Sequence, residues 1–240
     1  MKLCDLHTHV LPAVDDGAPT MEYALQMLQN AVAGDVETVV VTPHCNGTAA
    51  EGWTPPQQLW ERFLQLQAAA AGIPVQLVFG AECRVTGQLP KQLKEGALPT
   101  IGGSRYLLTE FAPDHTQSEC TAALQRILAE GLIPVVAHPE RLTAVCAAPA
   151  VAAQWVELGC HLQLTGDSIL GRFGRTCRNV CEFLLRNDLV ACVASDAHGL
   201  NHRSGFLPEV YDHLLVNYSR QYANFLLSIA PARICRDEDL

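Results

Sequence analysis

The chain has 240 residues, of which 49% are hydrophobic, and a formal net charge of −9 from 16 basic and 25 acidic residues. This length and apolar content suit a single domain with one sizeable core. An acidic chain without a run rich in lysine or arginine is a poor candidate for nucleic-acid binding. No apolar stretch approaches the roughly 20 residues that a membrane-spanning helix needs, so we expect no membrane insertion.

Alternating short apolar runs and longer helical patterns predict the fold. In chain order we predict a strand at 2–7, a helix at 20–33, a strand at 37–42, a helix at 55–71, strands at 75–81 and 106–110, a helix at 116–130, a strand at 133–137, a helix at 147–158, a strand at 161–165, a helix at 168–187, a strand at 189–194 and one or two closing helices within 205–229. The polar residues from about 233 to 240 are predicted to form a flexible tail.

This order of elements is typical of an α/β fold with parallel strands, here a single domain over residues 1–240. The runs "ETVVVT" and "IPVVA" are almost wholly apolar, as in strands that are buried on both faces. An open doubly wound sheet and a closed barrel both fit. No glycine-rich turn matches the dinucleotide-binding or P-loop pattern, so the usual ligands of open sheets have no support.

The ten cysteines do not indicate a disulfide framework. A domain of this size needs no covalent staples, and no cysteines have the spacing of a zinc knuckle. Most lie in apolar runs such as "LVACVAS", where a thiol packs as a small hydrophobic group. The N-terminus lacks the apolar segment of a signal peptide. We therefore expect a cytoplasmic protein.

Histidine and acidic residues stand at or just after the ends of six of the seven predicted strands. They are His7 and His9, His44, Glu82, Glu110, His138, and Asp196 with His198. The carboxyl ends of parallel strands form the active-site face of α/β sheets and barrels. Only the strand at 161–165 offers no strong candidate there.

The residue types and their spacing indicate a metal site. Imidazole and carboxylate together suit Zn, Mn or Fe, and the set is larger than one tetrahedral ion can use. His7 and His9 are two apart on a strand and so face the same side, and Asp196 and His198 repeat this spacing. In a closed barrel the first and last strands are neighbours, which would bring the two pairs together.

These residues and their surroundings resemble the PHP (polymerase and histidinol phosphatase) superfamily, and within it the CpsB/CapC/YwqE-type protein-tyrosine phosphatases. The matching stretches are "DLHTHVLPAVDDG", "VVVTPHCNG", "FGAE", "LLTEF", "VVAHPERL" and "VASDAHGLNHR", which run in the family's order from residue 5 to about residue 203. The resemblance implies a distorted (β/α)7 TIM-like barrel.

The resemblance also implies three divalent metal ions, with manganese as the first choice and iron, zinc or cobalt as alternatives. By matching positions, the first ion would be held by His7, His9, Glu82 and Asp196, the second by Glu82, Glu110 and His138, and the third by Asp16, His44 and His198. Asp16 is preferred to Asp15 because it directly precedes Gly17; Asp15 is open to reading as a turn residue. Arg141 and Arg203 match the family's phosphate-binding arginines, and His202 adjoins Arg203 as an alternative.

By the same resemblance, the chain would hydrolyse phosphotyrosine on protein, with the tail of a bacterial tyrosine kinase that regulates capsule or exopolysaccharide synthesis as its partner. Residues 44–60 could form a substrate loop beside the metals. The alternatives are another PHP-type phosphomonoesterase of the histidinol-phosphatase kind, which would act on a small molecule, and a non-catalytic metal-binding barrel. The sequence does not indicate the oligomeric state.

A cysteine mechanism is the remaining alternative. The stretch "CTAALQR" places Cys120 and Arg126 at the Cys-x5-Arg spacing of cysteine-dependent tyrosine phosphatases. It lies in a helical pattern and has no glycine for a loop that could cradle a phosphate. We interpret the match as chance and expect a mechanism that is based on metal ions.

Overall fold

The computed structural model describes residues 2–45, 54–201 and 203–240. Residues 46–53 of the predicted substrate loop, and His202, lie outside this range. The strands are β1 (Leu3–Thr8), β2 (Val36–Val41), β3 (His44–Cys45), β4 (Gln76–Phe79), β5 (Glu82–Arg84), β6 (Tyr106–Glu110), β7 (Ile133–Ala137), β8 (His161–Thr165) and β9 (Cys192–Ala194). All of their pairings are parallel.

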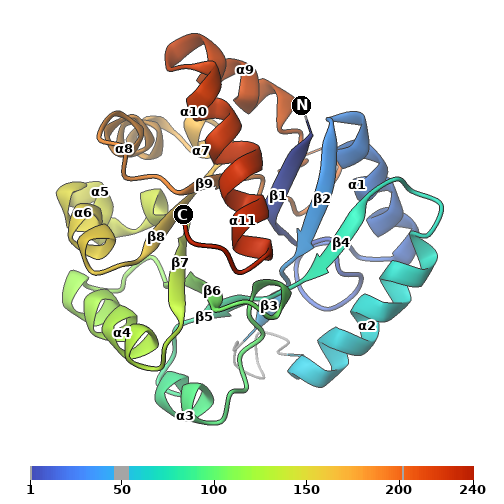
Figure 1. The fold of residues 1–240 in the computed structure, drawn as a ribbon, viewed down its shortest axis with the longest axis horizontal. Helices are drawn as coiled ribbons and strands as arrows, with labels where there is room; N and C mark the ends of the chain where they lie inside the picture. Colours follow the sequence, from blue (N-terminus) through green and yellow to red (C-terminus); the bar gives the residue numbers. More distant parts are fainter. Residues whose placement is uncertain (1, 46–53, 202) are drawn as a thin grey trace.

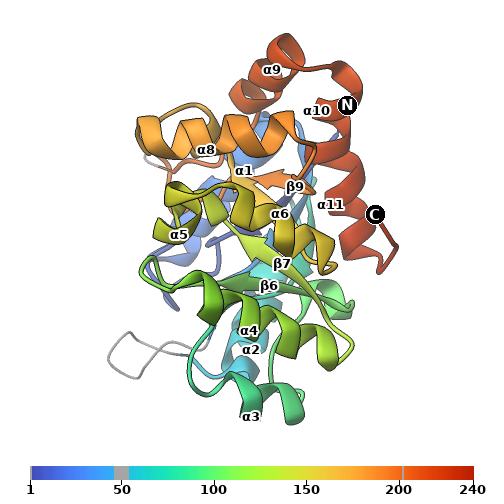
Figure 2. The ribbon, with the colours of Figure 1, turned by 90° about the vertical axis from the view of Figure 1, so that its left-hand side faces the viewer.

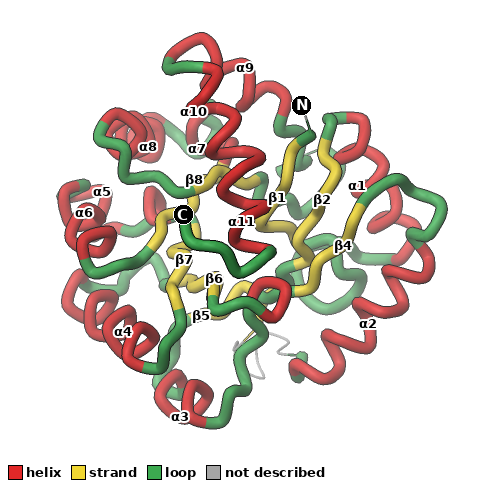
Figure 3. Tube along the Cα trace, in the orientation of Figure 1, coloured by secondary structure: helices red, strands yellow, loops and turns green. Residues whose placement is uncertain are grey.

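The helices lie outside the strands, as Figures 1 and 3 show. They are α1 (Met21–Ala33), α2 (Pro56–Ala69), α3 (Leu89–Lys94), α4 (Gln117–Ala129), α5 (Thr143–Ala147), α6 (Ala150–Glu157), α7 (Gly166–Ile169), α8 (Arg175–Arg186), α9 (Pro208–Asn217), α10 (Arg220–Asn224) and α11 (Ala230–Cys235), with 3-10 turns η2 (Ile101–Gly103) and η3 (Pro139–Arg141) and the π-helical turn η4 (Phe225–Ile229). Within the described residues, no helix is both long and apolar enough to cross a membrane.

The strands form a distorted barrel rather than an open sheet. One sheet has the order β1-β2-β4 and the other β3-β5-β6-β7-β8-β9. The first and last strands meet at a bridge between Thr8 and Ala197, where the His9 amide donates to the Ala197 carbonyl over 2.8 Å. The two sheets also join along the chain, where β2 leads into β3 and β4 leads into β5. The predicted α/β class with a TIM-like arrangement of parallel strands is therefore confirmed, and the joining of the two sheets favours the barrel over the open doubly wound alternative.

Two predicted strands bend where they pass from one sheet to the other. The strand predicted at 75–81 covers β4, Gly80 and Ala81, and β5 follows directly after it. In the same way β2 is followed by Thr42 and Pro43 before β3; Pro43 has no N–H to give to a ladder. Its carbonyl accepts from the Glu82 amide over 3.0 Å, so the two bends are joined. The bends place His44 directly opposite Glu82 in the β3–β5 pairing.

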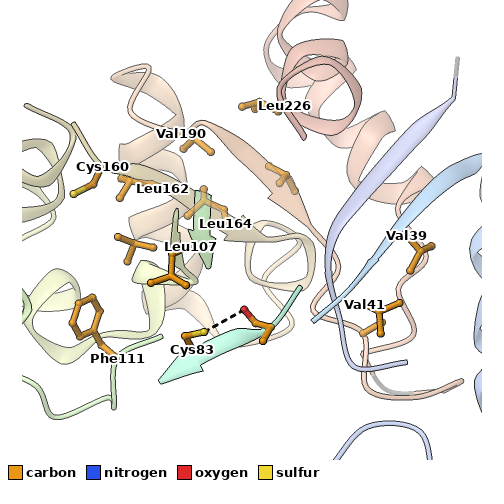
Figure 4. Close-up of a cluster of buried hydrophobic side chains, with 14 of the residues drawn as sticks. Val39, Val41, Cys83, Leu107, Phe111, Cys160, Leu162, Leu164, Val190 and Leu226 are labelled. Carbon is orange, nitrogen blue, oxygen red and sulfur yellow. Dashed lines mark hydrogen bonds between the residues drawn. The ribbon is translucent and has the colours of Figure 1, made fainter. Parts of the chain in front are cut away.

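The core has two layers. Alternate strand residues such as Tyr106 and Leu108 point into the barrel, where Ile101 and Ile234 pack with them. The residues between them, such as Leu107, face the surrounding helices in a larger apolar cluster. Figure 4 shows part of this outer layer, in which Leu107, Leu162 and Leu164 lie toward Phe111 and Cys160. Both layers are needed because strands in such a barrel are covered on both faces.

The C-terminal helices close the amino end of the barrel. The segment from α10 to α11 crosses in front of the strands in Figure 1 and runs along one side of the molecule in Figure 2. Ser228 donates to the carbonyl of Lys2 over 2.7 Å, close to the start of β1. With this end covered, the carboxyl ends of the strands are the end at which a site can open.

The last residues differ from the predicted flexible tail. The Arg105 amide donates to Asp237 over 2.9 Å, and the Tyr106 hydroxyl donates to the Glu238 carbonyl over 2.7 Å. Leu240 packs against the inner apolar cluster. These contacts were not foreseeable from local composition, because the partners are about 130 residues away in the sequence.

Candidate metal centre

All nine candidate ligands lie at the carboxyl end of the barrel. Most follow directly from strand positions: His7 in β1, His9 after it, His44 at the start of β3, Glu82 at the start of β5, Glu110 at the end of β6, His138 after β7, and Asp196 and His198 after β9. Asp16 comes from the loop between β1 and α1. Arg141 ends the turn η3, and Arg203 follows β9.

The loop that carries Asp16 folds back onto the end of β1. The Ala18 amide donates to the His9 carbonyl over 3.0 Å. A Cβ atom on Gly17 would lie 2.0 Å from that carbonyl oxygen, so only glycine allows this approach. The tight return places Asp16 above His9, although the two are seven residues apart.

The predicted first ligand set is assembled in the structure. We call it the inner group: His7, His9, Glu82 and Asp196, all fully or almost fully buried. The Nε2 atoms of His7 and His9 are 3.1 Å apart, and each lies 3.3 Å from Glu82 Oε2. Asp196 Oδ1 lies 3.5 Å from the first nitrogen and 3.6 Å from the second. The donor atoms of His7, His9 and Glu82 therefore group at distances that suit one metal ion, and Asp196 lies next to both histidines.

The predicted third set also comes together. We call it the outer group: Asp16, His44 and His198. Asp16 Oδ1 lies 3.5 Å from His44 Nε2 and 3.3 Å from His198 Nε2. The Asp16 side chain is 65% exposed, so this group faces outward. His9 links the two groups, since its ligand nitrogen falls within reach of both.

Glu82 lies between the groups. Its Oε1 is 2.8 Å from His138 Nε2, and its Oε2 is 3.0 Å from His44 Nδ1 as well as near the inner histidines. Although burial opposes ionisation, the surrounding imidazoles hold the pKa of Glu82 well below its usual range. One oxygen thus faces His138 and the other faces the inner group, the arrangement that a bridging carboxylate needs.

Glu110 departs from the predicted second set. Its two oxygens accept from Arg84, Oε2 from Nε over 2.8 Å and Oε1 from Nη2 over 3.2 Å. Arg84 and Glu110 are register partners on β5 and β6. Among the described residues, Glu110 groups with His44 and Glu82, while His138 belongs to none of the metal-sized groups. Both Glu110 oxygens therefore accept from the guanidinium, and Glu110 does not share a metal-sized group with His138.

Both predicted phosphate-binding arginines reach the inner group. Arg141 Nη2 lies 2.8 Å and Arg203 Nη2 2.6 Å from Asp196 Oδ2. The Arg141 guanidinium also lies over the Phe173 ring, 4.0 Å from its centre. Arg141 and Arg203 line a cavity of about 220 Å³ together with members of both groups. Of His202, the alternative to Arg203, nothing is described.

The backbone at these positions is unusual. His138 (φ 34°), Asp196 (φ 54°) and Arg203 (φ 50°) all have left-handed conformations. Such conformations cost roughly 1–3 kcal/mol each in non-glycine residues and concentrate at functional sites. His138 and Arg203 line the cavity and Asp196 contacts its two arginines, which indicates that the surrounding fold holds these side chains in place against local preference.

The inner group fits a divalent metal ion. With metal–ligand bonds of about 2.1 Å, donor atoms around a tetrahedral ion lie about 3.4 Å apart, close to the 3.1–3.3 Å among His7, His9 and Glu82. Asp196 Oδ1 is buried and receives no hydrogen bond from the described residues. A buried carboxylate oxygen without a donor is costly unless a cation faces it. The donor set of imidazole and carboxylate suits Mn, Fe, Co or Zn.

A family model described as "Capsular polysaccharide synthesis, CpsB/CapC" matches residues 3–236. The chain belongs to the CpsB/CapC family. Among curated relatives, the tyrosine-protein phosphatase CpsB of Streptococcus pneumoniae is 29% identical over 98% of this chain and 99% of its own length. The tyrosine-protein phosphatase YwqE of Bacillus subtilis is 31% identical over 84% of this chain and 80% of its own.

Solved structures agree with the fold. A chain from the crystal structures of YwqE from Bacillus subtilis and CpsB from Streptococcus pneumoniae, described as metal-dependent tyrosine phosphatases, matches with a TM-score of 0.92 and 28% identity, over 99% of this chain and 96% of that chain. A lactonase from Listeria monocytogenes matches with a TM-score of 0.63 and 10% identity, over 99% and 95%. The second match concerns the fold alone.

Two side chains at this CpsB/CapC site were not among the predicted functional residues. Gln163, on the strand that offered no candidate, has its Oε1 2.9 Å from His7 Nδ1. Asp15, which was open to reading as a turn residue, has its Oδ2 2.9 Å from His9 Nδ1. For Gln163 a signal was present, because "HLQLT" puts one large polar residue between two leucines on a buried strand. For Asp15 no local signal separates it from Asp16.

The Cys120–Arg126 match has no part in this centre. Cys120 lies in helix α4 and is fully buried among apolar side chains. Burial, and then the charge of Glu119, raise the pKa of its thiol to about 12, whereas a nucleophilic cysteine needs a lowered pKa. None of the ten cysteines, all of which lie in the described part of the chain, forms a disulfide.

Proposed function

We propose that this chain is a metal-dependent phosphatase that hydrolyses phosphotyrosine on proteins. The observation that carries the proposal is the inner group, in which His7 and His9 lie 3.1 Å apart and each within 3.3–3.6 Å of Glu82 and Asp196, with Arg141 and Arg203 both touching Asp196 at its edge. The family relatives that are named tyrosine-protein phosphatases support the choice of substrate.

We assign three divalent ions to the site, manganese first, with iron, zinc or cobalt as alternatives. The inner group would hold one ion and the outer group another. Glu82, Glu110 and His138, the second of the predicted sets, would hold the remaining ion, and Glu82 would bind both this ion and the ion of the inner group. Bound ions would lower the pKa of a water molecule to make it a nucleophile and would offset the negative charge of the phosphate.

The chain's own residues would bind and orient the phosphate. Each arginine can direct two N–H groups at phosphate oxygens, which fixes the orientation of the phosphoryl group as well as its position. Arg141 is already held by the ring of Phe173, so less freedom is lost when the substrate binds. The leaving phenolate has a pKa near about 10 and departs more readily than an alkoxide, which relaxes the need for a strong acid on the leaving side.

The partner would be the tyrosine-containing tail of a bacterial tyrosine kinase that controls capsule or exopolysaccharide synthesis. The family description, capsular polysaccharide synthesis, supports this assignment. We place the protein in the cytoplasm, where such a tail would be phosphorylated. That none of the ten cysteines, all within the described residues, forms a disulfide is consistent with a reducing compartment.

A substrate panel tests the proposed function. Purified protein loaded with manganese should release phosphate from a phosphotyrosyl peptide and lose this activity after treatment with a chelator. Histidinol phosphate should be hydrolysed much more slowly. A preference for histidinol phosphate would make the chain a small-molecule phosphatase instead. Tight metal binding with no hydrolysis of either compound would indicate a non-catalytic barrel.

A further inference from the structure

The two histidines of the inner group are each held from behind by a different side chain. A histidine that binds a metal through Nε2 must carry its hydrogen on Nδ1, and the group that accepts this hydrogen sets both the tautomer and the ring orientation. Behind His7 that acceptor is Gln163, and behind His9 it is Asp15. These two contacts are of equal length, 2.9 Å, but differ in charge.

Gln163 is placed for this contact by the alternation of β8. Leu162 and Leu164 face the outer helices within the larger apolar cluster. Gln163, between them, points to the opposite face and is fully buried. Because the barrel interior is otherwise largely apolar, a buried amide there is costly unless it makes hydrogen bonds. The contact with His7 is the hydrogen bond that the structure provides.

The contact determines which nitrogen of His7 carries hydrogen. An amide oxygen only accepts, so Oε1 at 2.9 Å from Nδ1 requires a hydrogen on Nδ1. In the neutral ring Nε2 then keeps its lone pair. This nitrogen is the atom that lies 3.3 Å from Glu82 Oε2 and 3.5 Å from Asp196 Oδ1. The lone pair therefore lies on the side of the ring that faces Glu82 and Asp196.

Asp15 does the same for His9 and also fixes the surrounding backbone. Its Oδ2 faces His9 Nδ1 and accepts from the His44 amide over 3.0 Å, while Oδ1 accepts from the Gly17 amide over 3.0 Å. One carboxylate therefore connects an inner-group ring, the first residue of β3 and the turn that carries Asp16. Its side chain is only 5% exposed, so solvent competes little for these bonds.

We propose that Gln163 and Asp15 are positioning residues that hold the Nδ1–H groups of His7 and His9 and leave both Nε2 atoms free to bind one metal ion. The proposal rests on the metal dependence in the proposed function, and it adds residues that do not themselves contact the metal. Partners of this kind contribute roughly 10- to 100-fold to metal affinity.

Metal affinity of purified full-length variants tests the proposal directly. Zinc, which is diamagnetic, is titrated against a chromogenic chelator after removal of endogenous metal. Gln163→Leu should weaken the tightest site by roughly 10- to 100-fold, whereas Gln163→Glu, which still accepts from Nδ1, should stay within a few fold of the parent. Asp15→Asn keeps an oxygen acceptor but no charge and should weaken binding less than Asp15→Ala.

A matched control separates the loss of the His7 contact from any general effect of replacing a glutamine by leucine. Gln154 lies on the exposed face of α6, where its amide oxygen accepts from Gln117 over 3.0 Å. Gln154→Leu removes the same group far from the inner group, and its metal affinity should equal that of the parent. Thermal unfolding of each variant in the presence of chelator checks that the apo-fold is intact.

Proton–nitrogen NMR spectra report directly which ring nitrogen of His7 and of His9 carries the hydrogen. In long-range proton–nitrogen spectra of the zinc-loaded parent, His7 and His9 should both show protonated Nδ1 and metal-bound Nε2. In a folded Gln163→Leu variant, His7 should no longer be found only with protonated Nδ1 and metal-bound Nε2, whereas His9 should keep this form. Unchanged zinc affinity and an unchanged His7 spectrum in that variant would overturn the proposal. Failure of the phosphatase assay with these zinc results intact would overturn the proposed function alone.

Discussion

The metal centre has an inner side, which is the inner group, and a Glu110 side. Their side chains are oriented for metal binding to different degrees. On the inner side His7 and His9 have partners behind them, and their Nε2 atoms already face Glu82 and Asp196 at 3.3–3.6 Å. On the other side Glu110 has both oxygens on Arg84. Pre-organisation lowers the cost of binding. We infer that the inner site fills first and most tightly, and that the Glu110 site is the weakest.

Replacement of Glu82, the carboxylate that the inner side and the Glu110 side share, should impair metal binding on both sides. Glu82 faces His138 through one oxygen and three other imidazoles through the second, all within 3.3 Å. Glu82→Gln keeps the shape but removes the charge that these rings surround. We expect a loss of phosphatase activity of at least roughly 100-fold, because even residues behind metal ligands contribute 10- to 100-fold.

Metal content distinguishes the reasons for that loss. Elemental analysis of Glu82→Gln should show at most one ion per chain, at the outer group, which does not use Glu82, with helical content unchanged by circular dichroism. A variant that retains its full metal content and activity would show that Glu82 is not a ligand, and the division of the centre into two sides would then be wrong.

The arginines should affect the substrate and not the metals. Arg141→Lys keeps the positive charge near Asp196 but loses the planar fork and the stacking on Phe173. We expect the kcat/KM for a phosphotyrosyl peptide to fall by roughly tenfold, since hydrogen bonds to charged groups contribute about 1.5–3 kcal/mol, with metal stoichiometry unchanged. Steady-state kinetics and elemental analysis of the same preparation check this. A parallel loss of metal would place Arg141 among the groups that organise the inner side.

The sequence predicted the inner side better than the Glu110 side, and the reason is physical. Strand ends in a parallel barrel converge, so His7, His9 and Asp196 could be placed together from their positions alone. Glu110 stands at an equally good position, but its orientation depends on Arg84, which lies across the strand pair at a register that only the bend at Gly80 and Ala81 establishes. Local sequence does not reveal such a bend.

Gln163 and the C-terminal tail were missed for related reasons. Glutamine is a poor metal ligand, so a search for ligands passes over it, although its place between Leu162 and Leu164 points into the barrel. The tail looks polar and frayed until Arg105 supplies partners for Asp237. In both cases the deciding contact is with a residue more than 100 positions away.

Arg84 allows a direct test of the weak side. Arg84→Gln removes the charge that holds both oxygens of Glu110, and the cation no longer repels an incoming metal ion. We expect the weakest of the metal sites to bind severalfold more tightly, because a partly exposed ion pair contributes only about 0–1 kcal/mol. The inner site should not change. Calorimetric titration with manganese measures binding at the inner site and at the weakest site separately. Weaker binding at the weakest site in Arg84→Gln would instead show that Arg84 orients Glu110 for metal binding.

The smallest effect is expected at Cys120, which lies on neither side of the centre. Cys120→Ser places a hydroxyl in a fully buried apolar site in α4, so the free energy of unfolding should fall by about 1–3 kcal/mol. The kcat/KM of the folded, metal-loaded variant should nevertheless equal that of the parent, and chelator should abolish it in both. Because the pKa of this thiol is raised to about 12, almost none of it is thiolate at neutral pH. Two results together would contradict this: a folded Cys120→Ser variant without activity, and a parent protein that stays active after chelation. They would favour the cysteine mechanism and would mean that the metal centre has no catalytic role.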